Sequence, residues 1–119
     1  MAIVKKVLIV DDEEDFCYLL KSYLERKAFQ VQVSHNLADG IDKLKQYHPD
    51  FLFMDNNLPD GFGWDKVPSL LPEYPNMNVV LMSAFRKEGS DFSYKNDHCS
   101  FIEKPLNAEK LAQISKFLA

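Results

Sequence analysis

The sequence is poor in cysteine and histidine. Its two cysteines, Cys17 and Cys99, stand far apart without a CxxC spacing, so we expect neither a disulfide framework nor a zinc site. The three histidines, His35, His48 and His98, are scattered among polar residues and are expected at the surface. Chemistry based on a cluster of thiolates or imidazoles is therefore not predicted.

Long apolar runs and an excess of positive charge are also missing. The apolar runs Val7–Val10, Phe51–Met54 and Val79–Met82 are far too short to span a bilayer, and the N-terminus lacks the features of a signal peptide. Lys and Arg number 14 against 18 Asp and Glu, so no general affinity for nucleic acid or an anionic membrane is expected. These absences predict a cytoplasmic protein with reduced cysteines.

What the sequence does contain is an alternation of strand-like and helix-like segments over a single domain, residues 1–119. Strands are predicted over residues 3–10, 29–33, 51–54, 78–83 and 100–102. Helices are predicted over residues 16–27, 37–47, about 67–71, 86–99 and 108–118, with Asn36 and Asn107 as N-caps and Pro72 ending the third helix.

Five strands alternating with five helices predict an α/β fold of three layers with a parallel sheet. The second strand alternates apolar and polar residues, which places it at an edge and favours the flavodoxin-like (βα)5 order 2-1-3-4-5. In that order the topological switch point, where the order of the strands reverses, lies between strands 1 and 3. Ligands bind at such a switch point, beyond the carboxyl ends of the strands.

Polar side chains follow the strands that meet at this point. Asp11 and Asp12 follow the first strand and Asp55 closes the third. Neighbouring parallel strands lie about 4.8 Å apart, so these carboxylates must crowd one another, and an all-oxygen acidic cluster suits Mg²⁺. Ser83 and Lys104 end the next two strands. A divalent cation, a carboxylate, a hydroxyl and a lysine around one pocket predict phosphoryl transfer to an aspartate.

Each of these residues taken singly also admits a simpler role. Asp55 can cap the turn that follows it, and Ser83 can cap the turn after its strand. Lys104 can be an ordinary surface lysine near a helix start, and Phe101 can be a core aromatic with one rotamer. The prediction of a common site therefore depends on their joint position at the strand ends.

Four motifs together resemble the receiver domain of two-component response regulators over essentially the whole chain. They are Val-Asp11-Asp12, Asp55-Asn-Asn-Leu-Pro-Asp-Gly, Ser83-Ala84 and Phe101-Ile-Glu-Lys104-Pro105. The resemblance implies a phosphorylation-controlled signalling switch in which Asp55 accepts a phosphoryl group from a sensor histidine kinase or a histidine phosphotransfer protein. Such a protein catalyses only its own phosphorylation and dephosphorylation.

The resemblance also assigns roles around the metal. Asp12 and Asp55 would bind Mg²⁺ directly, together with the backbone carbonyl of Asn57, and Asp11 would act mainly through water. Lys104 would pair with Asp55 and then with the phosphate.

Further roles concern the switch and its lifetime. Ser83 would move to bond a phosphate oxygen, Phe101 would turn inward when it does, and Lys104-Pro105 would be a cis peptide. Asn57 and Phe85 are positioned to overhang the approach of the hydrolytic water. Phe85 is bulky and apolar, so we expect it to slow dephosphorylation. The alternative is that Phe85 packs against Phe92 or Tyr94 and does not reach the pocket.

The resemblance leaves partners and boundaries open. The segment 86–99 is poor in helix formers, and the chain ends where its last helix should end. A lone receiver would bind a downstream partner through its helix 4, strand 5 and helix 5 face, relay phosphate, or form a homodimer on phosphorylation. A fragment of a longer regulator is equally compatible with the sequence.

Three other functions were compared with this one. A haloacid dehalogenase-type phosphatase would close strand 1 with an Asp-x-Asp motif and carry a cap, and neither is found. A phosphorylation-independent interaction module would not need every pocket position filled by a competent residue. Flavin binding is disfavoured because the loop after strand 1 is acidic where a phosphate needs donors.

Overall fold

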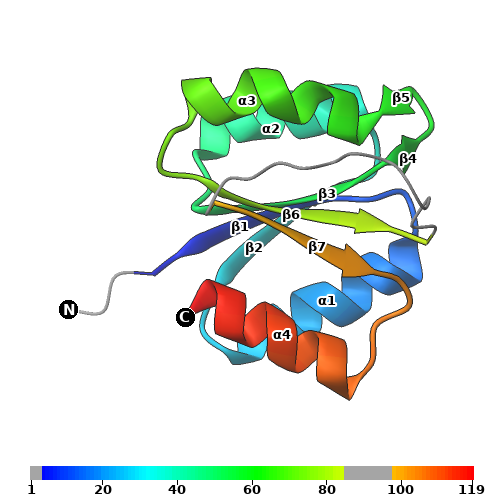
Figure 1. Ribbon diagram of the computed structural model, residues 1–119, viewed down its shortest axis with the longest axis vertical. Coiled ribbons are helices and arrows are strands. Elements are labelled where there is room, and N and C mark those ends of the chain that lie inside the picture. The colour runs from blue at the N-terminus through cyan, green and yellow to red at the C-terminus, as the bar shows by residue number, and fades with distance from the viewer. Residues whose placement is uncertain (1–3, 85–97) are drawn as a thin grey trace.

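The computed structural model describes residues 4–84 and 98–119, which form a central sheet covered by helices on both faces (Figure 1). The sheet strands are β1 (Lys6–Val10), β2 (Gln30–Ser34), β3 (Phe51–Asp55), β6 (Asn78–Ser83) and β7 (Cys99–Glu103). The helices are α1 (Glu14–Arg26), α2 (Leu37–Tyr47), α3 (Val67–Glu73) and α4 (Ala108–Leu118). The hairpin of β4 (Asn57–Leu58) and β5 (Gly61–Phe62), followed by a 3-10 turn, η1 (Gly63–Lys66), connects β3 to α3.

The sheet is parallel throughout, in the order β2-β1-β3-β6-β7. Numbered along the chain, this is the order 2-1-3-4-5, so the predicted fold class and topology are confirmed. β1 and β3 are neighbours at the switch point, with Val10 paired to Met54. The residues that follow these two strands therefore leave the sheet side by side.

Two layers of helices bury the two faces of the sheet. In Figure 1, α1 and α4 lie on one face and α2 and α3 on the other. Side chains alternate accordingly: Ile9 and Phe53 pack in the cluster under α1 and α4, and Leu8 and Leu52 pack in the cluster under α2 and α3. Successive side chains of a strand point to opposite faces, so a strand covered on both sides must be apolar at every position.

The helix starts follow the sequence closely. Asn36 Oδ1 accepts a hydrogen bond from the backbone N–H of Asp39, and Asn107 Oδ1 accepts one from Lys110, each at 2.8 Å. Both predicted N-caps are therefore present, and each satisfies an N–H that the first turn of a helix leaves without a partner. None of the helices within the described ranges is long and apolar enough to cross a membrane.

Element boundaries differ from the prediction in a few places. β1 begins at Lys6 rather than Ile3, because its register with β2 starts there. Pro72 does not end α3, which continues to Glu73. Pro72 lies in the last turn of this helix, so the hydrogen bond that a proline removes is lost only near the helix end. Cys99 belongs to β7 instead of the helix predicted over residues 86–99, and the part of that helix before residue 98 lies outside the described residues.

Candidate functional site

Three carboxylates gather at the carboxyl edge of the sheet. Asp11 follows β1, Asp55 ends β3, and Asp12 comes next along the first loop. Each offers a carboxylate oxygen, and these oxygens all lie within 4.8 Å of one another. Oxygen ligands with this much negative charge suit a hard divalent cation such as Mg²⁺ better than a transition metal. The donor set of this cluster therefore fits the metal that the sequence predicted.

Asp11 and Asp12 differ in how much of their carboxylates is already engaged. Asp11 is fully buried, with Oδ1 accepting a hydrogen bond from the Glu13 N–H at 2.9 Å and Oδ2 paired to Lys104 Nζ at 2.6 Å. Asp12 is exposed. Because both Asp11 oxygens have protein partners, Asp12 is the better placed of the two to meet an incoming cation directly.

Lys104 provides the positive charge of the cluster. Its side chain is buried at the end of β7, and Nζ lies 2.6 Å from Asp11, 3.2 Å from Glu13 Oε1 and 3.4 Å from Asp55 Oδ1. The ammonium also lies 4.4 Å from the centre of the Phe16 ring, a cation–π geometry. Lys104 thus reaches Asp55, as the resemblance implies, while making its shortest contact with Asp11.

The three carboxylates of the cluster carry more negative charge than Lys104 alone can neutralise. Burial, and then the charge of Asp11, raise the pKa of Asp55 to about 6 from its usual 3.8, against the lowering effect of Lys104. Burial also raises the pKa of Asp11, although its bond to Lys104 opposes the change. A cation bound between these groups would relieve this repulsion.

Ser83 and Phe101 lie on the other side of Asp55, on β6 and β7. Ser83 is buried at the end of β6, and its backbone carbonyl accepts a hydrogen bond from the Lys104 N–H at 2.9 Å. Phe101 is half-buried, with its ring edge-to-face against Trp64 at a centroid distance of 5.7 Å. The peptide between Lys104 and Pro105 is cis. Ser83 therefore ends the strand next to Asp55, and Phe101 packs against the loop that follows Asp55.

The two residues predicted to influence hydrolysis have different outcomes. Asn57 is exposed at the start of β4, two positions after Asp55. Phe85 lies outside the described residues, so its predicted role stays a prediction from the sequence.

Sequence reasoning missed several contacts of this site. No role was predicted for Glu13 from the sequence, yet its carboxylate accepts a hydrogen bond from Lys104 Nζ at 3.2 Å. The carbonyl of Asp11 is bonded by the Cys17 thiol at 3.2 Å and by His35 Nδ1 at 2.9 Å. Burial raises the pKa of Cys17 to about 12, so it is an inert thiol. The helix predicted over residues 16–27 includes Phe16 and Cys17, but no pattern in the sequence indicated their partners.

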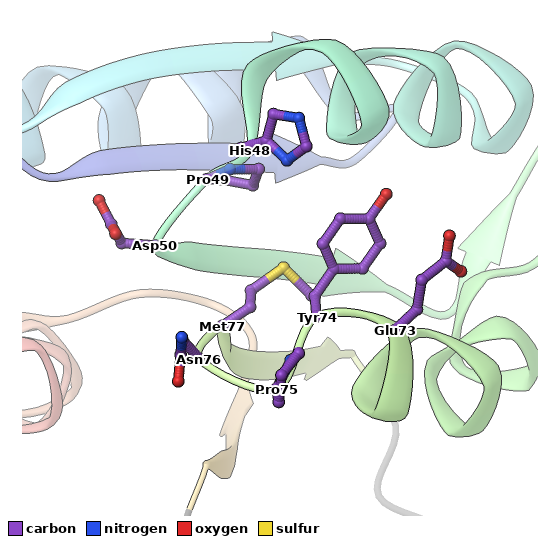
Figure 2. Close-up of a pocket in the computed structure, with 8 residues that line it drawn as sticks. All are labelled: His48, Pro49, Asp50, Glu73, Tyr74, Pro75, Asn76 and Met77. Atoms are coloured by element: carbon purple, nitrogen blue, oxygen red, sulfur yellow. The ribbon is translucent and has the colours of Figure 1, made fainter.

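A second hollow lies at the opposite edge of the sheet. Figure 2 shows it between the loop that enters β3 and the loop that enters β6. Its volume is about 270 Å³. The rings of His48 and Tyr74 face one another there at a centroid distance of 6.3 Å, and Met77 closes the floor. The described residues that line it include no lysine or arginine to neutralise a phosphate. The acidic cluster is therefore the better candidate for phosphoryl chemistry.

Comparison with known proteins agrees with this site. The family model of the response regulator receiver domain matches residues 7–116. That range includes every residue of the cluster, from Asp11 to Lys104, together with the whole sheet apart from the first residue of β1.

Individual relatives are similar over most of this chain. The transcriptional regulatory protein YxdJ of Bacillus subtilis is 29% identical over 107 residues, covering 87% of this chain but only 45% of YxdJ. The polar-differentiation response regulator DivK of Brucella ovis is 24% identical over 115 residues, covering 94% of each chain. The structure of TrrA from Thermotoga maritima, solved in complex with Mg²⁺-BeF, superposes with a TM-score of 0.82 at 23% identity, covering 98% of this chain and all of TrrA.

Proposed function

The chain belongs to the response regulator receiver domain family, and from this premise we propose that Asp55 is the phosphoacceptor of its phosphorylation-controlled switch. A receiver is not a conventional enzyme, so the phosphatase considered from the sequence is set aside. The observation that carries the proposal is the position of Asp55 at the end of β3, where its Oδ1 lies 3.4 Å from Lys104 Nζ and beside the other two carboxylates. Asp11 lies closer to Lys104, but its Oδ1 already accepts from Glu13 N–H and its Oδ2 is paired to Lys104. We propose that residues 1–119 act as one receiver unit.

The chemistry proposed for Asp55 is an in-line displacement. A carboxylate oxygen of Asp55 forms a bond to phosphorus while the P–N bond of a phosphohistidine breaks, and the imidazole leaves with a proton. Asp12, Asp55 and the backbone carbonyl of Asn57 would hold Mg²⁺, which when bound would neutralise negative charge on the transferred group. Lys104 exchanges its contacts with carboxylates for one with a phosphate oxygen, and Ser83 donates its hydroxyl to another.

The partners of this reaction follow from its chemistry. The phosphoryl donor would be a sensor histidine kinase or a histidine phosphotransfer protein, in the cytoplasm where ATP supplies such kinases. The readout surface would include β7 and α4, through which a downstream protein or a second copy of the chain would bind, whereas the fourth predicted helix of that face lies outside the described residues. The packing of Phe101 against Trp64 supports this proposal, because it joins that face to the loop after Asp55.

Incubation with a small phosphodonor tests the function directly. With acetyl phosphate and Mg²⁺, the protein is expected to gain one phosphoryl group that is stable in acid and lost in base, as an acyl phosphate is. Intact-mass spectrometry measures it, and the same incubation with EDTA is the control. A chain that gains no phosphate under these conditions, or gains as much with EDTA, would contradict the proposal.

Mg²⁺ binding is expected to depend on Asp12 more than on Asp11. Asp12→Ala removes an exposed ligand and should weaken binding by at least about tenfold, whereas Asp11→Ala removes a group already bonded within the protein and should weaken it less. Trp64 is a suitable reporter because its indole N–H donates to the Met54 carbonyl, beside Asp55. Equal losses of affinity in the fluorescence titrations would mean that the direct and water-mediated roles were misassigned.

A further inference from the structure

The loop that follows Asp55 is held at two points. At its base, the Asn56 carbonyl accepts a hydrogen bond from Gly63 N–H at 3.0 Å, and the Asn56 side chain accepts one from Trp64 N–H at 3.3 Å. Between Asn56 and Gly63 the chain makes the hairpin of β4 and β5, in which Asn57 pairs with Phe62. The base of the loop is therefore closed on itself, and something else must fix its tip.

The tip is fixed by Asp60. Its carboxylate accepts hydrogen bonds from the N–H groups of Leu37 and Ala38, at 2.7 and 2.9 Å, which are the first two residues of α2. Within the described part of the chain, these two hydrogen bonds join the hairpin tip to another element. The carboxylate also faces the positive end of the helix, where a negative charge is stabilised. The pKa of Asp60 is accordingly held below its usual value by these two bonds.

Apolar contacts strengthen the same junction. Leu58 of the hairpin and Leu37 of α2 belong to one buried cluster, together with Trp64. Gly61 follows Asp60 with a φ of +151°, and a Cβ at this position would lie 3.3 Å from Leu37 Cδ2. The close approach of the tip to α2 therefore depends on a glycine directly after Asp60.

We propose that Asp60 is a positioning residue for the metal site. Asn57, whose backbone carbonyl would bind Mg²⁺, lies between the anchor at Asn56 and the anchor at Asp60, so both anchors determine where that carbonyl lies. Asp60 itself is not one of the carboxylates of the acidic cluster. This inference rests on the proposed function, because it concerns the same metal site.

An alternative role for Asp60 is purely structural, since it satisfies two N–H groups that the start of α2 would otherwise leave without partners. The chain provides a matched control for that role. Asn36 caps the same helix start by accepting from Asp39 N–H at 2.8 Å, and no hydrogen bond of the described residues links its side chain to the hairpin. Asn36→Ala and Asp60→Ala should both loosen α2, but only Asp60→Ala should free the hairpin tip.

The experiment measures Mg²⁺ affinity by isothermal titration calorimetry on the full chain. Asp60→Ala is expected to weaken Mg²⁺ binding by about tenfold, while Asn36→Ala changes it by less than about twofold. Asp60→Asn keeps one of the two acceptor oxygens, and so one of the two hydrogen bonds to α2, and should weaken affinity by only about threefold. Thermal melts of all variants confirm that each is folded during the titrations.

The outcomes separate the inference from the function it rests on. Equal affinity losses in Asn36→Ala and Asp60→Ala would overturn the inference, because loosening α2 would then explain both. Equal losses in Asp60→Asn and Asp60→Ala would also overturn it, since a variant that keeps one of the two anchoring bonds should lose less affinity than one that keeps neither. If Asp12→Ala leaves the binding heat unchanged, the metal site itself is wrong, and the proposed function fails independently of Asp60.

Discussion

Asp55→Asn is expected to remain unphosphorylated by acetyl phosphate in the presence of Mg²⁺. An amide oxygen is a far weaker nucleophile than a carboxylate, and the substitution also removes one ligand of the metal. Asp11 cannot replace it, because its two oxygens are engaged with Glu13 and Lys104. We expect complete loss of the acyl phosphate by intact-mass spectrometry. A variant that still gains the same base-labile phosphate would place the nucleophile elsewhere.

The same variant should nevertheless be more stable than the original protein at neutral pH without metal. The pKa of Asp55 is about 6 in the folded protein and near 3.8 in the unfolded chain, so between these values the unfolded chain holds fewer protons on this group. Its contribution to stability is therefore fully present below about pH 4 and is lost as the pH rises through about 6. A shift of this size corresponds to about 3 kcal/mol.

Urea denaturation in EDTA at several pH values measures this difference. At pH 4 both proteins carry a neutral side chain at position 55, so their free energies of unfolding should nearly coincide. At pH 7 the variant should be more stable by about 2–3 kcal/mol, because only the original protein keeps a buried charge there. A variant that is less stable than the original protein at pH 7 would show that the buried charge of Asp55 does not lower the free energy of unfolding. Loss of phosphorylation with a gain in stability cannot be explained by unfolding.

The parts of this protein that the sequence predicted well are those specified by long apolar patterns. Phe51–Met54 is buried in full, as a strand between two helical layers must be, and the alternation in β2 placed that strand at the edge. The sheet order then brought Asp11 and Asp55 together without any knowledge of side-chain positions. A site at a switch point can be predicted because topology alone determines which strand ends are neighbours.

The parts that were missed depend on contacts between distant residues. β4 and β5 have two residues each, too few for any periodicity to be recognised. Asp60 in the motif after Asp55 has the composition of an ordinary turn, and its partners Leu37 and Ala38 lie more than 20 residues earlier in the chain. Glu13 was similarly hidden, because its partner Lys104 is 91 positions away.

Gly63 is needed for a reason that its sequence context does not show. Its sequence context indicated only a turn, but in the structure the glycine is needed because the chain passes close to β3. A Cβ at Gly63 would lie 2.2 Å from the backbone carbonyl oxygen of Asp55 and 2.7 Å from the Met54 sulfur. Met54 can adjust its flexible side chain, but the carbonyl belongs to the sheet and to Asp55, the proposed phosphoacceptor.

Gly63→Ala should therefore destabilise the protein by about 3 kcal/mol and also weaken Mg²⁺ binding, because the backbone of Asp55 must move to accept the methyl group. Gly40→Ala is the matched control: its Cβ would meet only side-chain atoms of Val10, at 2.8 and 2.9 Å, and alanine favours the helix over glycine by about 1 kcal/mol. That variant should lose about 1 kcal/mol or less, with unchanged Mg²⁺ affinity. Urea denaturation and calorimetry measure both quantities. If Gly63→Ala proves no worse than Gly40→Ala, the turn adapts by moving away from Asp55, and the close approach is not needed to hold the phosphoacceptor in place.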